Sequence, residues 1–443
     1  MLQVMTHAKT AIFIGYVWPE PNTTAAGQNI LSYMTTLVEN NWHVHFWCAA
    51  DKGVHAVDLE QHNVNVQQIK LNDDSFNQSL KTCMPSIVIF DRFLTEEQFA
   101  WRVAETCPDA LRVLDCEDLH FLRHGREVLH KQSLKIRKKT LKATQPEQYQ
   151  TSNDIFAEVS LSLLHTPQFH RELASIMRCD LVITLSSFER QVLQDKYGVA
   201  KDNTMHLPFI RPKPKGHSPT FEARQNIVTI GNLKHRPNVV AIEHLVERIM
   251  PPLRKHIPGI ELHVYGDYAP PRILQLHNPK KGIFILGFVK DHIHVISHAR
   301  LLVAPLHFGA GVKGKLLDAM TCMTPSVTTP IGAEGINIVH WPGAICTDDA
   351  MFVDKTIALY TDKSLWTEAS EFTRSQDNVH FSISDNQRYL ISRLTHALEN
   401  RHLYRAKNFL QGIMMQQGMQ ASKYMSQWIV AKNKLKVLIE DEK

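Results

Sequence analysis

The sequence predicts a doubly wound α/β protein of two Rossmann-like domains, and three observations support this fold class. Apolar runs of strand length alternate with longer amphipathic stretches, which is the pattern of parallel strands joined by crossover helices. A basic, proline-rich segment interrupts this alternation near the middle of the chain, and the alternation then restarts. The length of 443 residues allows two hydrophobic cores, since a domain typically takes ~100–200 residues.

The first half of the chain predicts a series of parallel strands. Each apolar run is short and is bounded by polar or turn residues, as expected for a strand buried in a sheet. These runs are Ala11 to Tyr16, Val44 to Cys48, Ile87 to Phe90, Arg112 to Asp115 and Leu181 to Leu185. Helical patterns such as Ala26 to Asn40 lie between them, so crossover helices are expected to join the strands.

The segment from Pro208 to Pro219 contains four prolines and a glycine among basic residues, which is typical of an extended linker. A second strand-turn-helix series follows, at Ile227 to Ile230, Glu261 to Tyr265, Phe284 to Leu286 and Leu301 to Pro305. From about Leu394, few helix breakers occur and the apolar spacing favours packing helices. We therefore divide the chain into an amino-terminal domain (1–212), a linker (213–222), a carboxy-terminal domain (223–393) and a helical tail (394–443).

The composition excludes several classes of protein. The formal net charge of +5 and the pI near 8.7 fall short of the clustered charge of a dedicated nucleic-acid binder, so we expect an anionic small molecule and no nucleic acid. The apolar stretch Ala11 to Val17 is too short to span a bilayer. The residues before it lack the charged region and cleavage site of a secretory signal, so we expect a cytoplasmic protein.

Neither the cysteines nor the histidines form a recognised metal motif. The seven cysteines are scattered, and none pairs at the two-residue spacing of zinc and redox sites. None of the 25 histidines sits beside acidic residues in a recognised ligand motif. The sequence therefore predicts buried free thiols and no metal site.

The turn after the first strand has the composition of an anion site. The run Pro19 to Gly27 leads into a helix, whose free amides favour an anion. Gly27 lacks a side chain, which permits a backbone to approach a phosphate closely. An ordinary strand-to-helix turn has the same composition, so this interpretation depends on support from elsewhere in the chain.

A glycine-rich loop in the second half supplies this support. Residues 305–320 read Pro-Leu-His-Phe-Gly-Ala-Gly-Val-Lys-Gly-Lys-Leu-Leu-Asp-Ala-Met and connect a strand to a helix. Lys313 and Lys315 place positive charge beside the amides at the helix start, where a diphosphate would be well held. Asp318 follows Lys315 by about one helical turn, where its carboxylate would accept hydrogen bonds from ribose hydroxyls. A solvated pair of lysines on a loop is the alternative interpretation.

This loop and the residues after it resemble the retaining, two-Rossmann (GT-B) glycosyltransferases of family 4. The matching text runs from Phe308 to Met320 and from Pro325 to Ile336. A second match, Ile230 to Val239, resembles the family segment whose basic residue reaches the donor diphosphate, and Lys234 and Arg236 are the candidates here. The resemblance covers most of residues 10–340 and is strongest in the second half.

The first half resembles the same family through Trp18 to Asn22, with Ala26 and Gly27, and through Asp115 to His120. The resemblance implies that the carboxy-terminal domain binds the donor, that the amino-terminal domain binds the acceptor, and that catalysis takes place in the cleft between them. It also implies that the tail packs back across this cleft.

Some positions depart from the family pattern. Family members carry two glutamates eight positions apart, and the second corresponds to Asp318 while the first corresponds to Ala310, which has no acid. The arginine that usually follows the glycine of the second segment is Asn232 here, so Lys234 or Arg236 must supply its charge. Because the first glutamate normally touches the donor sugar, the sequence leaves the identity of that sugar open.

Glycosyl transfer requires stabilisation of a negative diphosphate leaving group, which cations and helix dipoles provide without a metal. The predicted donor-binding residues are Gly27, Lys234, Arg236, Gly311, Val312, Lys313, Lys315 and Asp318, and the predicted catalytic residues are Asp118, His120 and Lys315. His120 would touch the donor sugar or move a proton. A capping Asp118 with a surface His120 is the alternative. The adjacent Asp91 and Arg92 are interpreted as a local structural pair.

These features predict a retaining, metal-independent glycosyltransferase of the hexosyltransferase type, active in polysaccharide biosynthesis. Its donor substrate is a nucleotide-diphosphate sugar, its acceptor is a glycan, a lipid-linked molecule or another acceptor, and no cofactor is expected. Two alternatives stay open: a catalytically silent protein that binds nucleotide or glycan as a partner, and a sugar-nucleotide epimerase on the same fold.

A basic run, Lys131 to Lys142, lies in the predicted acceptor domain. A basic helix at this place would rest on anionic lipid, with the protein at the inner face of a membrane near a lipid-linked acceptor. Most charge runs are solvated faces of a helix, and this is the alternative interpretation.

Overall fold

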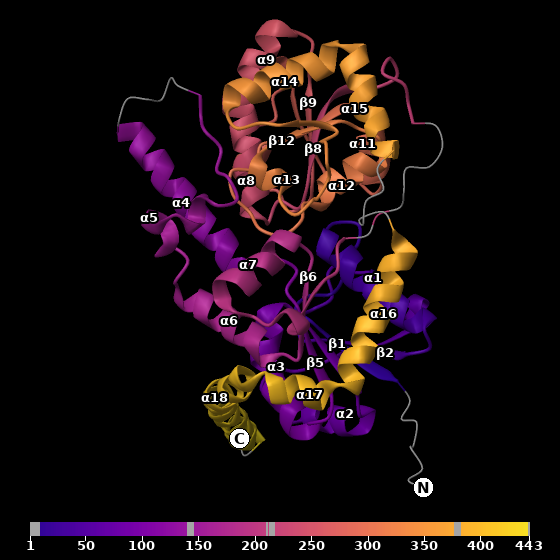
Figure 1. Ribbon diagram of the computed structural model, residues 1–443, viewed down its shortest axis with the longest axis vertical. Helices are drawn as coiled ribbons and strands as arrows, with labels where there is room; N and C mark the ends of the chain where they lie inside the picture. Colours follow the sequence, from indigo (N-terminus) through magenta and orange to yellow (C-terminus); the bar gives the residue numbers. More distant parts are fainter. Residues whose placement is uncertain (1–8, 140–145, 210, 212–217, 376–381, 442–443) are drawn as a thin grey trace.

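The computed structural model describes residues 9–139, 146–209, 211, 218–375 and 382–441 of the chain. Figure 1 shows two α/β domains stacked along the long axis of the molecule, each built around one sheet. The last strand of the first sheet ends at His206 and the first strand of the second begins at Gln225. Of the predicted linker, residues 213–217 lie outside the described residues. The two Rossmann-like domains confirm the predicted fold class.

The amino-terminal sheet has the strand order β3-β2-β1-β4-β5-β6-β7, and all neighbouring strands are parallel. Its strands are β1 (Thr10–Gly15), β2 (His43–Cys48), β3 (Val64–Gln68), β4 (Ile87–Asp91), β5 (Leu111–Asp115), β6 (Leu181–Thr184) and β7 (Thr204–His206). Its helices are α1 (Ala25–Glu39), α2 (Ser75–Cys83), α3 (Arg92–Thr106), α4 (His120–Lys139), α5 (Glu158–Leu161), α6 (Pro167–Arg178) and α7 (Ser187–Tyr197). The strand order reverses between β1 and β4, which opens a crevice at the carboxyl ends of these strands.

The carboxy-terminal sheet has the order β10-β9-β8-β11-β12-β13 and is also parallel throughout. Its strands are β8 (Gln225–Ile230), β9 (Leu262–Tyr265), β10 (Ile283–Gly287), β11 (Ala299–Ala304), β12 (Ser326–Thr328) and β13 (Gly343–Ile345). Its helices are α8 (Arg236–His244), α9 (Met250–His256), α10 (Pro271–Leu274), α11 (His292–His298), α12 (Gly314–Thr321), α13 (Pro330–Ala333), α14 (Asp349–Thr361) and α15 (Lys363–Ser375). Here the order reverses between β8 and β11.

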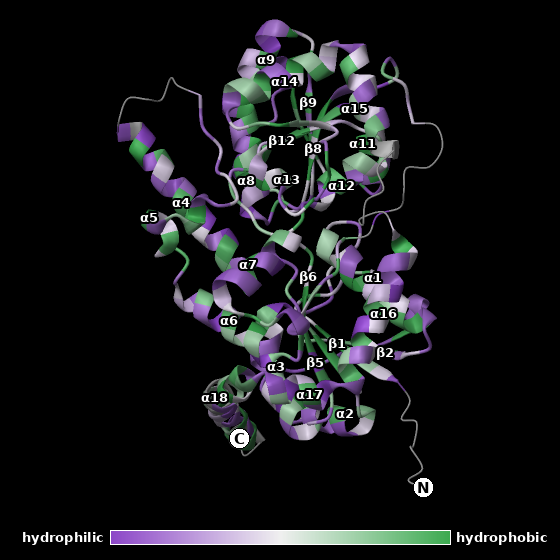
Figure 2. Cartoon of the chain, in the orientation of Figure 1, coloured by the Kyte–Doolittle hydropathy of each residue, from purple (hydrophilic) through white to green (hydrophobic). Residues whose placement is uncertain are grey.

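The central strands are buried on both faces because helices cover each sheet from both sides. Every residue of β1, β4 and β5 is buried. Figure 2 shows hydrophobic strands at the centre of each domain and helices that carry both hydrophilic and hydrophobic residues. The two cores therefore hold the carboxyl ends of the strands, and the loops that follow them, in fixed positions.

The carboxy-terminal helices return to the amino-terminal domain. Helix α16 (Ile383–Glu399) packs along α1, α17 (Arg401–Lys407) follows it, and α18 (Phe409–Asp441) packs against α3 and α6 (Figure 1). The Arg405 guanidinium of α17 holds these helices on the amino-terminal domain, because it donates two hydrogen bonds of 2.8 Å to the buried Asp180 carboxylate. The boundary predicted at residue 394 falls inside α16.

Helix α4 carries most of the basic run that would rest on lipid. The described part of this run ends at Lys139, and residues 140–142 lie outside the described residues. Lys131 pairs with Glu127 at 2.7 Å and Arg137 lies 3.8 Å from Glu147, so part of the positive charge is paired within the protein. In the described ranges, no helix has the length and apolar character needed to cross a membrane.

A buried ion pair joins the two domains. Arg126 of α4 donates from Nη1 to Glu334 Oε1 at 2.8 Å and from Nη2 to Glu334 Oε2 at 2.7 Å. The two side chains are only 0% and 1% exposed, so solvent and salt screen their attraction little. The same guanidinium donates to the backbone oxygen of Gly309 at 2.8 Å. Arg126 therefore holds α4 against both α13 and the glycine-rich loop after β11.

We predict that Glu334→Ala strongly destabilises the fold, because Arg126 would keep a buried charge without its partner. Removal of one member of a buried pair typically lowers the free energy of unfolding by ~3–5 kcal/mol. The double variant Arg126→Met/Glu334→Leu removes both charges and should recover part of this loss. Thermal denaturation of the three proteins measures the effect, and equal melting temperatures for the wild type and Glu334→Ala would contradict the role of the pair.

Candidate active site

A cleft of about 690 Å³ lies between the two domains. Its walls are the loops at the carboxyl ends of β1, β4 and β5 on one side and of β8 to β11 on the other. Both crevices at which strand order reverses open into it, and such crevices bind ligands in open α/β sheets. The predicted site residues that line it are Gly27, Asp118, His120, Lys234, Gly311, Val312, Lys313, Lys315 and Asp318. Together, these residues form one candidate site.

Lys315 carries a positive charge that no described carboxylate balances. It is the second residue of α12, and its Nζ donates to Asn238 Oδ1 at 2.8 Å. Among the residues that the structure describes, no carboxylate lies within ion-pair distance of this ammonium, and burial lowers its pKa to about 8. A largely buried ammonium with only a neutral amide as partner is unfavourable. An anion in the cleft would provide the missing negative charge.

Lys313 faces a different environment, although it also lines the cleft. Its Nζ donates to the backbone oxygen of Gly311 at 2.7 Å. Burial lowers the pKa of this ammonium, and the nearby Glu334 carboxylate partly opposes the shift. Lys313 therefore braces the glycine-rich loop beside the interdomain ion pair, whereas Lys315 leaves its charge available to a ligand.

Asp318 is held in place from two sides. Its Oδ1 accepts a hydrogen bond of 2.5 Å from Arg211 Nε, and its Oδ2 lies 3.6 Å from His292 Nε2. Burial by itself raises the pKa of this carboxyl, but Arg211 and His292 more than offset this and keep the pKa below its usual range. Asp318 is thus an oriented anion, one helical turn from Lys315. Its predicted contact with a ribose stays a prediction.

The two basic candidates of the segment after β8 lie in different places. Lys234 lines the cleft, and its Nζ lies 3.5 Å from the centre of the Tyr268 ring, in a cation–π contact. Arg236 is not among the cleft-lining residues. It is the first residue of α8, and its Nε lies 3.5 Å from Glu127 Oε1 of α4. Of the two, Lys234 is placed to reach an anion in the cleft.

The two glycines predicted to approach a phosphate permit close contacts within the protein, and their approach to a phosphate stays a prediction. A Cβ at Gly27 would lie 2.6 to 2.8 Å from backbone atoms of Glu20, so this glycine lets the preceding loop fold onto α1. Gly311 has a φ of +66°, and a Cβ there would lie 2.9 Å from Asp118 Cβ. Its amide donates to Glu189 Oε1 at 2.7 Å. Gly311 therefore brings the two domains into contact.

Asp118 and His120 lie together on the amino-terminal wall of the cleft. His120 Nε2 lies 3.3 Å from Asp118 Oδ1, and Arg123 pairs with the other oxygen of Asp118. Burial tends to raise the pKa of Asp118, but Arg123 and His120 lower it far below its usual range. The ring of Phe93 packs edge-on against His120 at 5.4 Å. Asp118 is therefore an ion that orients the His120 ring at the cleft surface.

A group of buried acids at the amino-terminal wall of the cleft was not predicted as part of the site. Asp91 and Asp115 are register partners at the ends of β4 and β5, and Arg92 donates to Asp91 at 3.0 Å, as expected for a local pair. Burial raises the pKa of Asp115 to about 7 and that of Glu117 well above its usual range, and neighbouring carboxylates add to both shifts. The sequence signal that could have identified this group is the aspartate at the end of each of two adjacent parallel strands, β4 and β5. Asp91, Arg92 and Glu117 also line the cleft.

Residues 224–362 match the family model described as Glycosyl transferases group 1. The matched region is therefore similar in sequence to the group 1 glycosyl transferases. It extends from the start of the second sheet to the end of α14 and contains the glycine-rich loop with Lys315. The predicted resemblance is thereby confirmed for the carboxy-terminal domain. No curated protein matches the chain significantly.

Solved GT-B glycosyltransferases share the whole two-domain fold. Anabaena HepE, in complex with UDP and glucose, is 13% identical with a TM-score of 0.60, and the match covers 88% of this chain and 100% of HepE. WaaG, a glycosyltransferase involved in lipopolysaccharide biosynthesis, is 15% identical with a TM-score of 0.56, and the match covers 86% and 98%. Sucrose-phosphate synthase from Thermosynechococcus elongatus is 14% identical with a TM-score of 0.55, and the match covers 90% and 100%. At such identities, these likenesses show the fold alone.

We predict that Gly311→Ala destabilises the protein more than Gly198→Ala does. Both glycines have left-handed backbones, with φ of +66° and +68°, but a Cβ at Gly198 would meet nothing within 4 Å. The left-handed backbone costs ~1–2 kcal/mol for an alanine, and the clash at Gly311 with Asp118 should add ~1–3 kcal/mol. Thermal denaturation of both variants checks this. Equal losses of stability would show that the two domains do not approach so closely at Gly311.

Proposed function

We propose that the protein is a glycosyltransferase that moves a sugar from a nucleotide-diphosphate donor to an acceptor. The observation that carries this proposal is Lys315, an ammonium without a described counter-ion, at the wall of an interdomain cleft and in the region similar to the group 1 glycosyl transferases. Shared GT-B architecture supports it, since HepE of the same fold was solved with UDP and glucose. The donor diphosphate would supply the negative charge that Lys315 lacks.

The donor would lie along the carboxy-terminal wall of the cleft. Lys315, at the amino terminus of α12, and Lys234, on the loop after β8, would hold the diphosphate from two sides. Asp318 would accept hydrogen bonds from ribose hydroxyls, because Arg211 and His292 keep it ionised and oriented. In this arrangement the sugar points to the amino-terminal wall, where Asp118 and His120 lie.

In the transfer reaction, the bond between the anomeric carbon of the sugar and the diphosphate oxygen breaks. The diphosphate oxygen keeps the bonding electrons. An acceptor hydroxyl oxygen forms the new glycosidic bond and releases its proton. Stabilisation of the departing diphosphate by Lys315, Lys234 and the dipole of α12 assists this step, and we propose that the donor site needs no metal ion for it. As the family resemblance implies, we propose that the configuration of the sugar is retained.

We propose that a glycan or lipid-linked acceptor approaches from the amino-terminal domain. His120 is placed to contact the transferred sugar or to move the acceptor proton, since Asp118 orients its ring at the cleft surface. Helix α4, whose far end carries exposed lysines, extends away from the domain in Figure 1. This end would contact anionic lipid at the cytoplasmic face of a membrane.

We predict that a nucleoside diphosphate raises the melting temperature of the wild type and that Lys315→Ala loses this effect. Loss of a charge-assisted contact typically weakens binding by ~1.5–3 kcal/mol. The measurement is a thermal-shift screen against UDP, GDP, ADP and dTDP and their common sugars, with and without magnesium. Lys280→Ala, an exposed lysine outside the cleft, is the matched control and should behave as wild type.

The products distinguish the proposal from its alternatives. With the donor that binds, the wild type should slowly release nucleoside diphosphate, and it should form a new glycoside when an acceptor is present. An isomerised nucleotide sugar would indicate an epimerase instead. Binding without any turnover would indicate a silent partner protein. If no nucleotide shifted the melting temperature, the proposed role of Lys315 in binding the diphosphate would be contradicted.

We also predict that nucleotide affinity falls as the pH rises above about 8. Lys315 binds an anion only in its protonated form, and its pKa in the free protein is about 8. A bound diphosphate raises this pKa, so affinity is steady near pH 7 and decreases up to tenfold per pH unit above pH 8. The diphosphate itself is fully ionised there, since its last pKa is about 6.

Titration calorimetry from pH 7 to pH 9.5 measures this dependence. Lys315→Arg stays charged over the whole range and should bind with a nearly constant affinity. An equal decrease in the wild type and in Lys315→Arg would assign the dependence to another group.

A further inference from the structure

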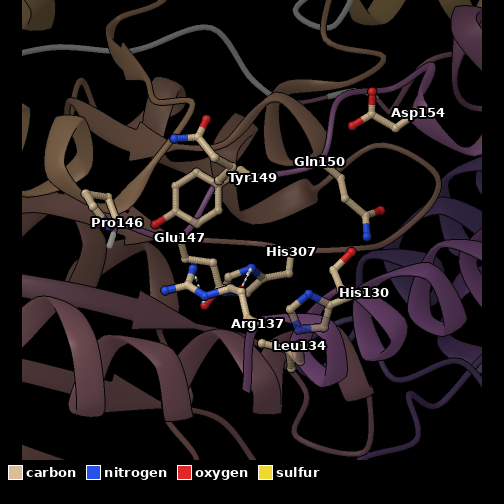
Figure 3. Close-up of a pocket in the computed structure, with 11 residues that line it drawn as sticks. His130, Leu134, Arg137, Pro146, Glu147, Tyr149, Gln150, Asp154 and His307 are labelled. Carbon is tan, nitrogen blue, oxygen red and sulfur yellow. Dashed lines mark ion pairs between the residues drawn. The ribbon is translucent and has the colours of Figure 1, made fainter. Parts of the chain in front are cut away.

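A second cavity lies away from the donor cleft and shares none of its lining residues. It has a volume of about 370 Å³ and lies between α4, the segment 146–150 and His307 of the glycine-rich loop. Figure 3 shows two imidazole rings, His130 and His307, near the carboxylate of Glu147 on the inner wall of this cavity. Nothing in the donor chemistry uses these three side chains.

The three side chains have the composition and spacing of a metal site. Each offers one ligand atom, and these atoms all lie within 4.8 Å of one another. His307 Nδ1 lies 3.4 Å from Glu147 Oε1, and the two imidazole rings stack with centroids 4.5 Å apart. Two imidazoles and one carboxylate are a typical three-residue ligand set for Zn²⁺.

The histidines are buried, and the ring nitrogens of one of them have no hydrogen-bond partner among the described residues. His130 is 6% exposed and His307 is 2% exposed. In the described ranges of the chain, no residue forms a hydrogen bond with the ring nitrogens of His130. These nitrogens are not fully shielded, because His130 lines the adjoining cavity. A metal ion that enters from the cavity would supply the partner that they lack.

A second pair of residues, His244 and Asp349, contacts Glu147 and orients it. His244 Nε2 lies 2.7 Å from Asp349 Oδ1, and His244 Nδ1 lies 4.0 Å from Glu147 Oε2. The Glu147 amide donates to Asp349 Oδ2 at 3.3 Å, and its carbonyl accepts from the Asp349 amide at 3.1 Å. Metal ligands in proteins are commonly oriented by such outer hydrogen bonds. Glu147 is therefore fixed in place before any ion binds.

We propose that His130, Glu147 and His307 bind one Zn²⁺ ion, with water from the adjoining cavity in the fourth position. The site is separate from the donor cleft and takes no part in the transfer step. His130 belongs to α4 of the amino-terminal domain, whereas His307 lies three residues after the end of β11, in the glycine-rich loop of the other domain. The ion thus ties the two domains together beside the loop that carries Lys315, next to the Arg126–Glu334 pair.

The experiment measures Zn²⁺ bound by the full chain after dialysis against a chelator. Titration calorimetry with zinc chloride, together with elemental analysis after gel filtration, should give one tightly bound ion per wild-type chain. Glu147→Gln keeps the shape of the side chain but removes a charged ligand, and it should lose this ion. Asp349→Asn keeps the shape of the side chain but weakens its outer contacts with His244 and Arg248, and it should weaken Zn²⁺ binding by about 10–100-fold.

The matched control is the exposed pair His294 and His298, whose rings lie 4.1 Å apart on α11. Such a pair on one helix face also attracts zinc, so His294→Ala/His298→Ala should keep the tight ion if the buried site holds it. Loss of the ion in this variant, or equal zinc content in the wild type and Glu147→Gln, would overturn the proposal.

Two further measurements distinguish the loss of metal binding from the loss of the folded structure. Circular dichroism should show the same helix content for Glu147→Gln as for the wild type. In place of zinc, Co²⁺ should give the wild type the visible absorption of a low-coordinate site, and Glu147→Gln should lack it. A wild type without this absorption would contradict the ligand set, whatever the result of the nucleotide screen.

Discussion

The closed cleft depends on the buried ion pair between Arg126 and Glu334. Both side chains are buried, so each charge is stable only when the other lies beside it and accepts or donates hydrogen bonds. The pair therefore favours one relative position of α4 and Glu334, the residue after α13. A second bridge acts beside it, because Glu189 accepts from the amides of Leu119 and Gly311, one in each domain. The width of the cleft, and hence the distance from Lys315 to His120, follows from these contacts.

Much of the fold could be predicted because its central strands are nearly continuous apolar runs. The ends of β1, β4 and β5 differ from the predicted ranges by a residue or so, since burial on both faces leaves a clear signal. Strands β7, β12 and β13 have only three residues each, too few for any periodicity. The longer β6 and β11 pair with β7 and β12, and β13 pairs with β12 at the edge of its sheet. Strand β3 lies at a sheet edge and reads Val-Asn-Val-Gln-Gln, which resembles a polar loop.

The candidate site could be predicted only where its residues are close together in the chain. The glycine-rich loop and Asp318 occupy one continuous stretch, and the structure places them at one wall of the cleft. Asn238 beneath Lys315 and Arg211 beside Asp318 are 77 and 107 residues away from their partners, and no local pattern marks such pairs. The same limit applies to His130, Glu147 and His307, which have no metal-motif spacing and meet only because the domains close.

Most of the buried charges that the structure describes have an opposite charge beside them. Glu96 pairs with Arg178, Asp180 with Arg405 and Asp318 with Arg211. Arg224 has no carboxylate beside it, but it donates to four protein oxygens, whereas the described acceptor of the Lys315 ammonium is a single amide oxygen. A buried ammonium without a counter-ion does not stabilise a folded protein. The position of Lys315 is therefore better explained by ligand binding at the site than by the stability of the fold. An anion seated at the start of α12, such as the proposed donor diphosphate, would supply the negative charge that Lys315 lacks.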